Sequence, residues 1–329
     1  MKTQKYNYGT AILSAFEYLL KNYKETFVIG QGLWSPWYVG NTMTDLDKKF
    51  GKDRVIDTPV SESATTGAAI GASLAGMKPI VVHPRMDFML YSMDAIVNQA
   101  AKWSHMFGGQ AHPGVTIRSI INRGGEQGAQ HSQALHSWFA HVPGLRVVMP
   151  STVVDARDLL IASVLCKDPV IYIDDRWLYE QEADLAPIIE LDLKSEKPQI
   201  NLEGDDITII ASGHSSYLAR EAAKKLKSEN IFPEVIDIRI LNPMYINDII
   251  NSVKKTKKLL VVDSGCISSG FSGELIAKIV ENLEVSFLTS PPVRVALPDA
   301  PAPTSKTLEK EYYTSIDDIV LAVKKIKIK

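Results

Sequence analysis

Short, largely apolar segments alternate with helix-like segments along almost the whole chain. In the first half such runs occur at residues 26–29, 79–82, 146–149 and 170–173, and a helical pattern at 153–165 separates the last two. A strand that is buried on both faces appears in a sequence as an unbroken apolar run, because neither face is polar. Strands of this kind separated by helices are typical of a mainly parallel sheet covered by helices. The pattern therefore predicts an α/β fold.

Two further helices are predicted in this half. Apolar residues recur at helical spacing from Ile12 to Leu20, with Thr10 as the expected cap, and again from Met89 to Ala101.

The alternation breaks down between about residues 183 and 205, where charged residues and prolines replace it, and it resumes afterwards. We therefore predict two consecutive α/β domains, residues 1–185 and 206–329, joined by a linker at 186–205. The elements expected in the second domain are strands at 207–210, 234–237, 259–262 and 285–288 and helices at 216–227, 245–253, from 272 onward and at 315–326.

The composition excludes several classes of function. The chain has 329 residues, of which 45% are hydrophobic and 22% are charged, and its net charge is −2. Because the chain has no excess of basic charge, its composition does not indicate binding to nucleic acid or to an anionic membrane. No apolar run approaches the roughly 18 residues of a membrane span, and the first residues lack the apolar core of a signal peptide. Cys166 and Cys266 are not spaced as a metal-binding pair. We expect a cytoplasmic protein with reduced thiols.

Two polar clusters carry the functional signal. Residues 57–62, Asp-Thr-Pro-Val-Ser-Glu, precede a run of small residues, so the carboxyl group of Glu62 is expected at the start of a helix whose backbone another surface can approach. The second cluster, residues 128–133, contains His131. An acid at a helix start can simply complement the helix dipole. Neither cluster identifies a chemistry by itself.

Five motifs occur in a fixed order. They are Asp57-Thr58-Pro59 with Glu62, Ile96–Lys102, Gln130–Gln133, His141–Val148, and Val293–Val295 with Asp299–Pro303. In this order the chain resembles the β subunit of thiamine-diphosphate-dependent 2-oxoacid dehydrogenases, the decarboxylating component of the pyruvate and branched-chain complexes. The resemblance spans nearly the whole chain. It implies a transketolase-like fold, with a pyrimidine-binding domain followed by a transketolase C-terminal domain.

The resemblance also assigns roles to residues. It implies that Glu62 is catalytic and binds the aminopyrimidine ring of thiamine diphosphate, that Phe88 stacks on this ring, and that Val60 and Gln31 line the same site. His131 matches a catalytic histidine of the family, and histidine is a suitable proton carrier because it titrates near neutral pH. Structural alternatives remain open: core packing for Phe88 and Val60, and loop capping for His131.

The chain lacks a motif for the diphosphate of the cofactor. The superfamily binds the diphosphate through magnesium with Gly-Asp-Gly and a downstream Asn-Asn pair, and neither occurs in this sequence. A hard cation needs protein oxygens at fixed positions, so the resemblance implies that an α subunit supplies them, in an α₂β₂ heterotetramer that can dock on a lipoyl acyltransferase core. It also implies a monovalent ion such as potassium at a loop made of Val115, Ser163, Val164, Cys166 and Asp168.

Three positions depart from the family pattern. Gln31 replaces an acid, His83-Pro84-Arg85 replaces an acidic and apolar segment, and residues 118–123 replace an Arg-x-Pro loop. An arginine at the pocket mouth favours an anionic substrate, which makes Arg85 and His83 candidate substrate residues. These departures leave open the C-terminal half of a split transketolase-like enzyme that forms a carbon–carbon bond on a sugar or keto acid. A non-catalytic scaffolding relative is a third alternative, against which the intact motifs argue.

Overall fold

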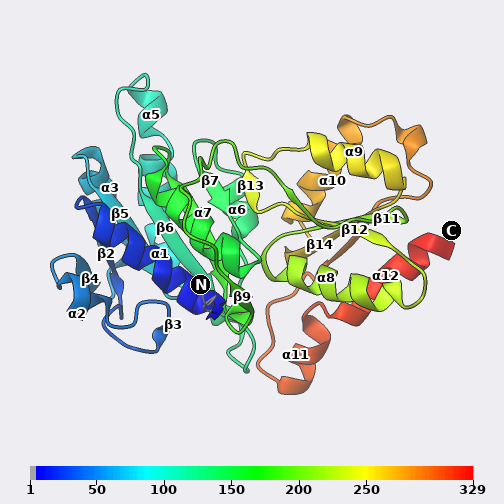
Figure 1. The fold of residues 1–329 in the computed structure, drawn as a ribbon, viewed down its shortest axis with the longest axis horizontal. Helices are drawn as coiled ribbons and strands as arrows, with labels where there is room; N and C mark the ends of the chain where they lie inside the picture. Colours follow the sequence, from blue (N-terminus) through cyan, green and yellow to red (C-terminus); the bar gives the residue numbers. More distant parts are fainter. Residues whose placement is uncertain (1–4, 329) are drawn as a thin grey trace. The chain divides into compact units, whose positions relative to one another are not determined.

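The chain folds as two compact units. The computed structural model describes residues 5–328. The first unit contains the chain up to Asn122 together with Trp138–Glu196, and the second contains Arg123–Ser137 together with the chain from Lys197 onward. Each unit has a mainly parallel sheet with helices packed on it (Figure 1), which confirms the predicted fold class. Residues 123–137 group with the second unit, although they lie inside the predicted first domain.

The sheet of the first unit has the strand order β7-β8-β6-β5-β2-β4, and these neighbours all pair in parallel. Its central strands β6 and β8 are buried along their whole length, although β6 contains Arg118 and Ser119 and β8 ends in Asp174 and Asp175. The strands are β2 (Thr26–Gln31), β4 (Val55–Thr58), β5 (Lys78–His83), β6 (Thr116–Ile121), β7 (Arg146–Val148) and β8 (Val170–Asp175). Outside this order are β3 (Tyr38–Asn41) and an antiparallel pair, β1 (Lys5–Asn7) with β9 (Glu182–Asp184).

Helices of the first unit pack on one another and on this sheet. The long helix α1 packs against α7, and α3 packs against β5. The helices are α1 (Tyr8–Asn22), α2 (Leu46–Phe50), α3 (Glu62–Leu74), α4 (Met86–Met89), α5 (Trp103–Met106), α6 (His136–Ala140) and α7 (Val153–Leu165), of which α6 begins in the second unit.

Two details of the predicted helices were wrong. Asn7 caps α1, because its side chain accepts the N–H of Thr10 at 2.8 Å, and Thr10 instead lies in the first turn and closes a capping box. The predicted helix from Met89 to Ala101 is broken into a 3₁₀ turn at Leu90–Ser92 and a π-helical segment at Asp94–Ala100. Apolar spacing predicts a helix but does not distinguish its hydrogen-bond pattern.

The second unit has a five-stranded sheet in the order β10-β12-β11-β14-β15. All of its pairs are parallel except β10 with β12. Its strands are β10 (Gln199–Leu202), β11 (Ile207–Ala211), β12 (Pro233–Asp237), β14 (Leu259–Cys266) and β15 (Val293–Leu297), and β13 (Ile240–Asn242) is a further short strand. Its helices are α8 (Gly213–Lys227), α9 (Asn247–Thr256), α10 (Phe271–Glu281), α11 (Lys306–Tyr312) and α12 (Ile316–Ile328).

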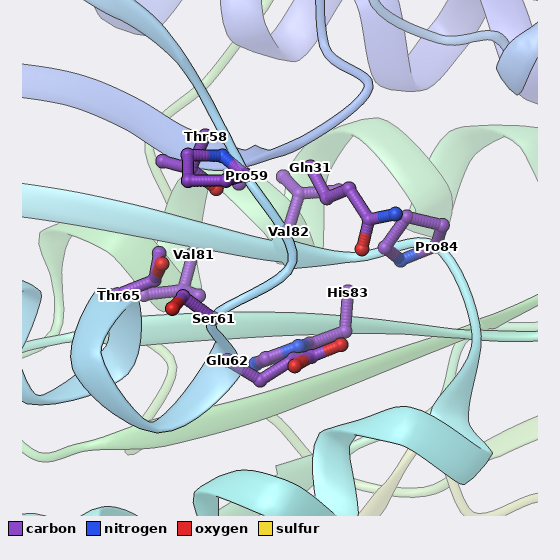
Figure 2. A pocket seen from close by; sticks show the side chains of 11 residues that line it. Gln31, Thr58, Pro59, Ser61, Glu62, Thr65, Val81, Val82, His83 and Pro84 are labelled. Carbon is purple, nitrogen blue, oxygen red and sulfur yellow. The ribbon is translucent and has the colours of Figure 1, made fainter.

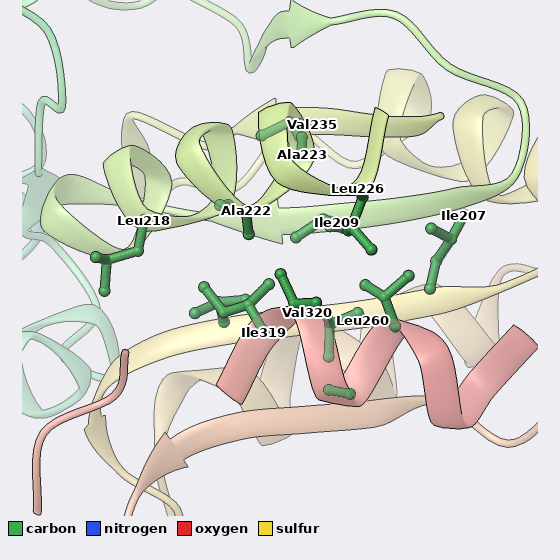
Figure 3. Close-up of a cluster of buried hydrophobic side chains, with 14 of the residues drawn as sticks. Ile207, Ile209, Leu218, Ala222, Ala223, Leu226, Val235, Leu260, Ile319 and Val320 are labelled. Atoms are coloured by element: carbon green, nitrogen blue, oxygen red, sulfur yellow. The ribbon is translucent and has the colours of Figure 1, made fainter. Parts of the chain in front are cut away.

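A core of aliphatic side chains lies between α8, α12 and the central strands of this sheet (Figure 3). Ile209, Leu226 and Ile319 are fully buried in it. The strand predicted at 285–288 was wrong, because Val285–Phe287 forms a 3₁₀ turn. None of the helices formed by residues 5–328 is long and apolar enough to cross a membrane.

A buried ion pair lies inside the first unit. Arg118 and Asp174 have no exposed side-chain surface, and the guanidinium donates to both carboxylate oxygens at 3.0 and 2.8 Å. Thr42 and Tyr179 accept further hydrogen bonds from the same guanidinium, each at 2.9 Å. Although burial alone would lower the pKa of Arg118, the Asp174 carboxylate raises it above its usual range.

Candidate cofactor site

A hollow opens in the first unit at the carboxyl ends of β2, β4 and β5, where α3 begins (Figure 2). This edge is where open α/β sheets bind ligands. The hollow brings together three predicted site residues, Glu62, Gln31 and His83. Its lining consists of Gly30, Gln31, Thr58, Pro59, Ser61, Glu62, Thr65, Val81, Val82, His83 and Pro84.

Close backbone packing forms the floor of the hollow. A Cβ atom on Gly30 would lie 2.4 Å from the carbonyl oxygen of Val82, so only glycine lets β2 and β5 approach so closely. The Asp57 carboxylate then fixes the loop after β2, because it accepts the N–H groups of Gly32 at 2.7 Å and Trp34 at 3.3 Å. The Asp-Thr-Pro motif therefore holds the rim as well as leading into α3.

Glu62 is the first residue of α3, as the sequence predicted. Its side chain is partly buried and lines the hollow. Unpaired N–H groups at a helix start favour a carboxylate there. Gly67 and Gly71, farther along the helix, have open space where a side chain would stand, so this face of α3 is open to a close approach.

His83 contributes a neutral, buried imidazole at the end of β5. Its side chain is almost completely buried, and burial lowers its pKa to about 4. Its Nε2 lies 3.3 Å from the Thr66 hydroxyl, which in turn lies 2.9 Å from the Ser92 hydroxyl. At neutral pH this histidine is uncharged and belongs to a chain of neutral polar groups.

A rim of polar groups continues from Gln31. The Gln31 side-chain amide donates to the Tyr38 hydroxyl at 3.0 Å, and the Tyr38 carbonyl accepts from Arg176 at 2.8 Å. Arg85 is partly buried next to Pro84, and it donates to the carbonyl of Asn122 at 3.2 Å. Burial, together with the charge of Arg176, lowers the pKa of Arg85 from its ordinary value. The guanidinium groups of Arg85 and Arg176 therefore act on each other electrostatically.

Besides Arg85, three predicted site residues lie outside the lining of this hollow. Val60 is 69% exposed, and Phe88 is half-buried in α4. His131 belongs to the second unit, where it ends a 3₁₀ turn and donates its N–H to the Gly128 carbonyl at 3.3 Å. The roles assigned to these three residues stay predictions.

Two residues of the loop predicted to bind a monovalent ion make hydrogen bonds with other residues of the chain. The Ser163 hydroxyl donates to the Leu159 carbonyl at 2.6 Å. The Asp168 carboxylate accepts from Arg146 at 2.8 Å and lies 3.5 Å from Lys194. Burial would raise the pKa of Asp168, and these two cations lower it below its usual range. Within residues 5–328, no group of three or more His, Cys, Asp or Glu side chains is arranged to hold a metal ion.

Comparison with known proteins identifies the family. The model described as "Transketolase, pyrimidine binding domain" matches residues 4–181, and that described as "Transketolase, C-terminal domain" matches residues 196–319. The "Pyruvate dehydrogenase E1 component subunit beta" of Rickettsia bellii is 36% identical over 302 residues, which cover 92% of each chain. The chain belongs to this family of β subunits. The resemblance inferred from the sequence motifs is thereby confirmed, and the family implies thiamine diphosphate as cofactor and an α subunit as partner.

Other relatives differ in their names and coverage. The Rhizobium meliloti pyruvate dehydrogenase E1 β subunit is 33% identical over 303 residues, and the match spans 66% of its length. The "Acetoin:2,6-dichlorophenolindophenol oxidoreductase subunit beta" of Cupriavidus necator is 38% identical over 273 residues, covering 83% of this chain and 80% of that protein. A solved "Split gene transketolase, inactive beta4 tetramer" covers 98% of both chains with a TM-score of 0.75 and 20% identity, which is a likeness of fold.

Sequence reasoning did not predict the residues that form hydrogen bonds around the lining residues His83 and Gln31. Thr66 and Ser92 look like ordinary small polar residues, and only the packing of α3 against the following turn places them beside His83. Tyr38 gave no signal either, since its hydroxyl meets Gln31 from a separate strand. Asp57 had a detectable signal, because an aspartate at the end of a strand can accept loop N–H groups.

Proposed function

We propose that this chain is the β subunit of a thiamine-diphosphate-dependent 2-oxoacid dehydrogenase, which decarboxylates a 2-oxo acid and passes the acyl group to a lipoyl carrier. The observation that carries the proposal is Glu62, a carboxyl group at the start of a small-residue helix that lines a hollow at the carboxyl edge of the sheet, in a chain of this family. When bound, the cofactor supplies the electron sink for decarboxylation. The protein supplies orientation and proton transfer.

The residues that line the hollow suit one end of this cofactor. The hollow offers a single carboxyl group between apolar walls from Pro59, Val81 and Val82, which suits a flat heterocycle with ring nitrogens. The diphosphate end finds no counterpart, because residues 5–328 contain no metal-binding cluster and the sequence has no Gly-Asp-Gly. We infer that the α subunit provides the magnesium ligands in an α₂β₂ heterotetramer, and that the assembly docks on a lipoyl acyltransferase core.

The residues of this chain then have separate roles toward the cofactor. Glu62 holds a proton for the pyrimidine nitrogen, Gln31 lines the site, and Phe88 and Val60 contact the ring from segments beside the hollow. His131 moves or stabilises charge during acyl transfer. Gln31 cannot carry a proton, so Glu62 is the acid of this group.

Glu62→Gln tests the central assignment. Because an amide cannot exchange a proton with the ring, the variant in complex with the α subunit should lose cofactor C2 hydrogen–deuterium exchange by about 10²-fold or more. Glu180→Gln, an exposed change in the same unit, should leave exchange unaltered. Exchange at the wild-type rate in Glu62→Gln would remove this residue from the mechanism.

Calorimetry tests the divided site. The chain alone should bind thiamine diphosphate with magnesium at least ~10²-fold more weakly than it does with the α subunit, because the diphosphate has no metal ligands here. Equally tight magnesium-dependent binding to this chain alone would contradict the proposal.

Potassium at the loop of Val115 and Asp168 is part of the same proposal. An identical Tm in potassium and tetramethylammonium buffers would exclude potassium binding at this loop.

The relatives suggest two classes of substrate, an anionic 2-oxo acid and the neutral hydroxyketone acetoin. Arg85, beside the lining residue Pro84, favours the acid because its guanidinium can bind a carboxylate. Arg85→Leu should raise KM for pyruvate by roughly 10-fold or more and leave KM for acetoin within about twofold. Equal effects on both substrates would show that Arg85 does not recognise the carboxylate. His83, which is buried and neutral, would shape the pocket and carry no charge to the substrate.

Carbon–carbon bond formation is the second candidate, and the replacement of an acid by Gln31 together with Arg85 favours it. The complex should be offered pyruvate with a lipoyl acceptor and, separately, with a sugar aldehyde. A ligated product and no acyl-lipoyl product would select this candidate.

A further inference from the structure

The loop that carries His131 is built into the C-terminal unit. We call residues 123–137 the His131 loop, and it contacts β14, α11 and the segment before α11. It contains several left-handed backbone positions, including Gly124, Gly125 and Gly128. Contacts with the rest of the second unit therefore contribute to its conformation.

Glu309, in α11, holds the middle of the loop. Its side chain is buried, with 8% of its surface exposed, and both carboxylate oxygens accept the N–H of Glu126 at 3.0 Å. Glu126 has φ of +64°, a left-handed conformation that is unfavourable for a residue other than glycine. A charged acceptor makes a stronger hydrogen bond than a neutral one and stabilises this conformation. Two residues later, a Cβ atom on Gly128 would lie 3.0 Å from the Thr304 hydroxyl, so the loop also packs closely against the segment before α11.

Both ends of the loop are held by β14. At its start, Arg123 donates to the Ser264 carbonyl at 3.3 Å. At its end, Nε2 of His136 lies 2.9 Å from the buried carboxylate of Asp263, which also accepts the N–H groups of Gly265 and Ser272. With fixed ends, the contact of Glu309 with Glu126 sets the path of the residues between, which include His131.

We propose that Glu309 is a positioning residue that fixes the turn carrying His131, so that the C-terminal unit takes part in catalysis through this loop. The inference rests on the catalytic role proposed for His131. It gives the C-terminal unit a task beyond assembly, since the carboxylate that orders the loop lies about 180 residues farther along the chain.

Hydrogen–deuterium exchange of the full chain tests the anchor without cofactor or substrate. Glu309→Ala should accelerate exchange of the backbone amides of residues 124–133 by roughly 10-fold to 100-fold, because the charged acceptor of the Glu126 N–H is lost. Glu309→Gln keeps one acceptor oxygen and should restore most of the protection. Glu311→Ala, an exposed change in the same helix, should leave the loop unchanged. Unchanged exchange in Glu309→Ala would overturn the inference.

A double-variant cycle on the complex with the α subunit tests the catalytic consequence. Glu309→Ala should lower kcat by about 10-fold or more, with cofactor affinity and C2 exchange at wild-type values, because only the His131 loop is displaced. In the His131→Ala background the same change should lower kcat by less than about twofold. Losses that multiply would refute the inference and leave the role of His131 intact. If His131→Ala itself retained wild-type kcat, the role proposed for His131 would fail, and the inference with it, whatever the loop exchange showed.

Discussion

His83 should make the stability of this protein depend on pH in a predictable window. Its pKa is about 4 in the folded chain because of burial, against 6.5 for the exposed group. Between these two values the unfolded chain binds a proton that the folded chain excludes, so stability rises with pH through the window and is lost as pH falls. The contribution is fully present above pH 6.5. Each pKa unit corresponds to about 1.4 kcal/mol, so the full effect of the shift from 6.5 to about 4 is about 3–4 kcal/mol.

At pH 5.0 the unfolded group is almost fully protonated and the folded group is mostly neutral. Linkage then predicts that His83 alone removes about 2 kcal/mol of unfolding free energy between pH 7.5 and pH 5.0. Other groups titrate in the same range, so the informative quantity is the difference between the wild type and a variant without the imidazole. His83→Gln keeps a donor that can reach Thr66 and cannot titrate.

Urea unfolding at the two pH values and one fixed protein concentration measures this difference. The wild type should lose about 2 kcal/mol more than His83→Gln on acidification. The exposed residue His105 gives the control, since His105→Gln should follow the wild type. The reasoning is refuted if wild type and His83→Gln lose the same free energy, or if NMR titration of His83 gives a pKa near 6.5.

Two further predictions concern the framework of the first unit. Asp174→Ala should lower the unfolding free energy by about 3–5 kcal/mol, because it leaves Arg118 charged in a fully buried position. Asp168→Ala, which removes a partly exposed ion pair, should lower the unfolding free energy by no more than about 1 kcal/mol. Similar losses in urea titrations of the two variants would contradict the reasoning. Gly30→Ala should destabilise the chain by about 1–3 kcal/mol, because the new Cβ atom would lie 2.4 Å from the Val82 carbonyl oxygen. An unchanged Tm would show that β2 and β5 can separate at no cost in stability.

The sequence by itself determined several elements that have a clear apolar pattern. Strands β2, β5, β7 and β8 appear where apolar runs predict them, and helix α7 spans 153–165 as predicted. A run of apolar residues is a clear signal of a buried strand, and the order of motifs was enough to identify the family. The prediction failed at residues 285–288, where Val285–Phe287 forms a 3₁₀ turn.

The tertiary structure decided the properties that depend on distant neighbours. His83 is neutral because the fold removes water from around it, and no residue beside it in the sequence signals that desolvation. The His131 loop groups with the C-terminal unit because Glu309 and Asp263 bind it, although it lies within the predicted first domain. Periodicity reports which side of an element is buried, whereas hydrogen-bond partners and pKa values depend on which other elements are packed against it.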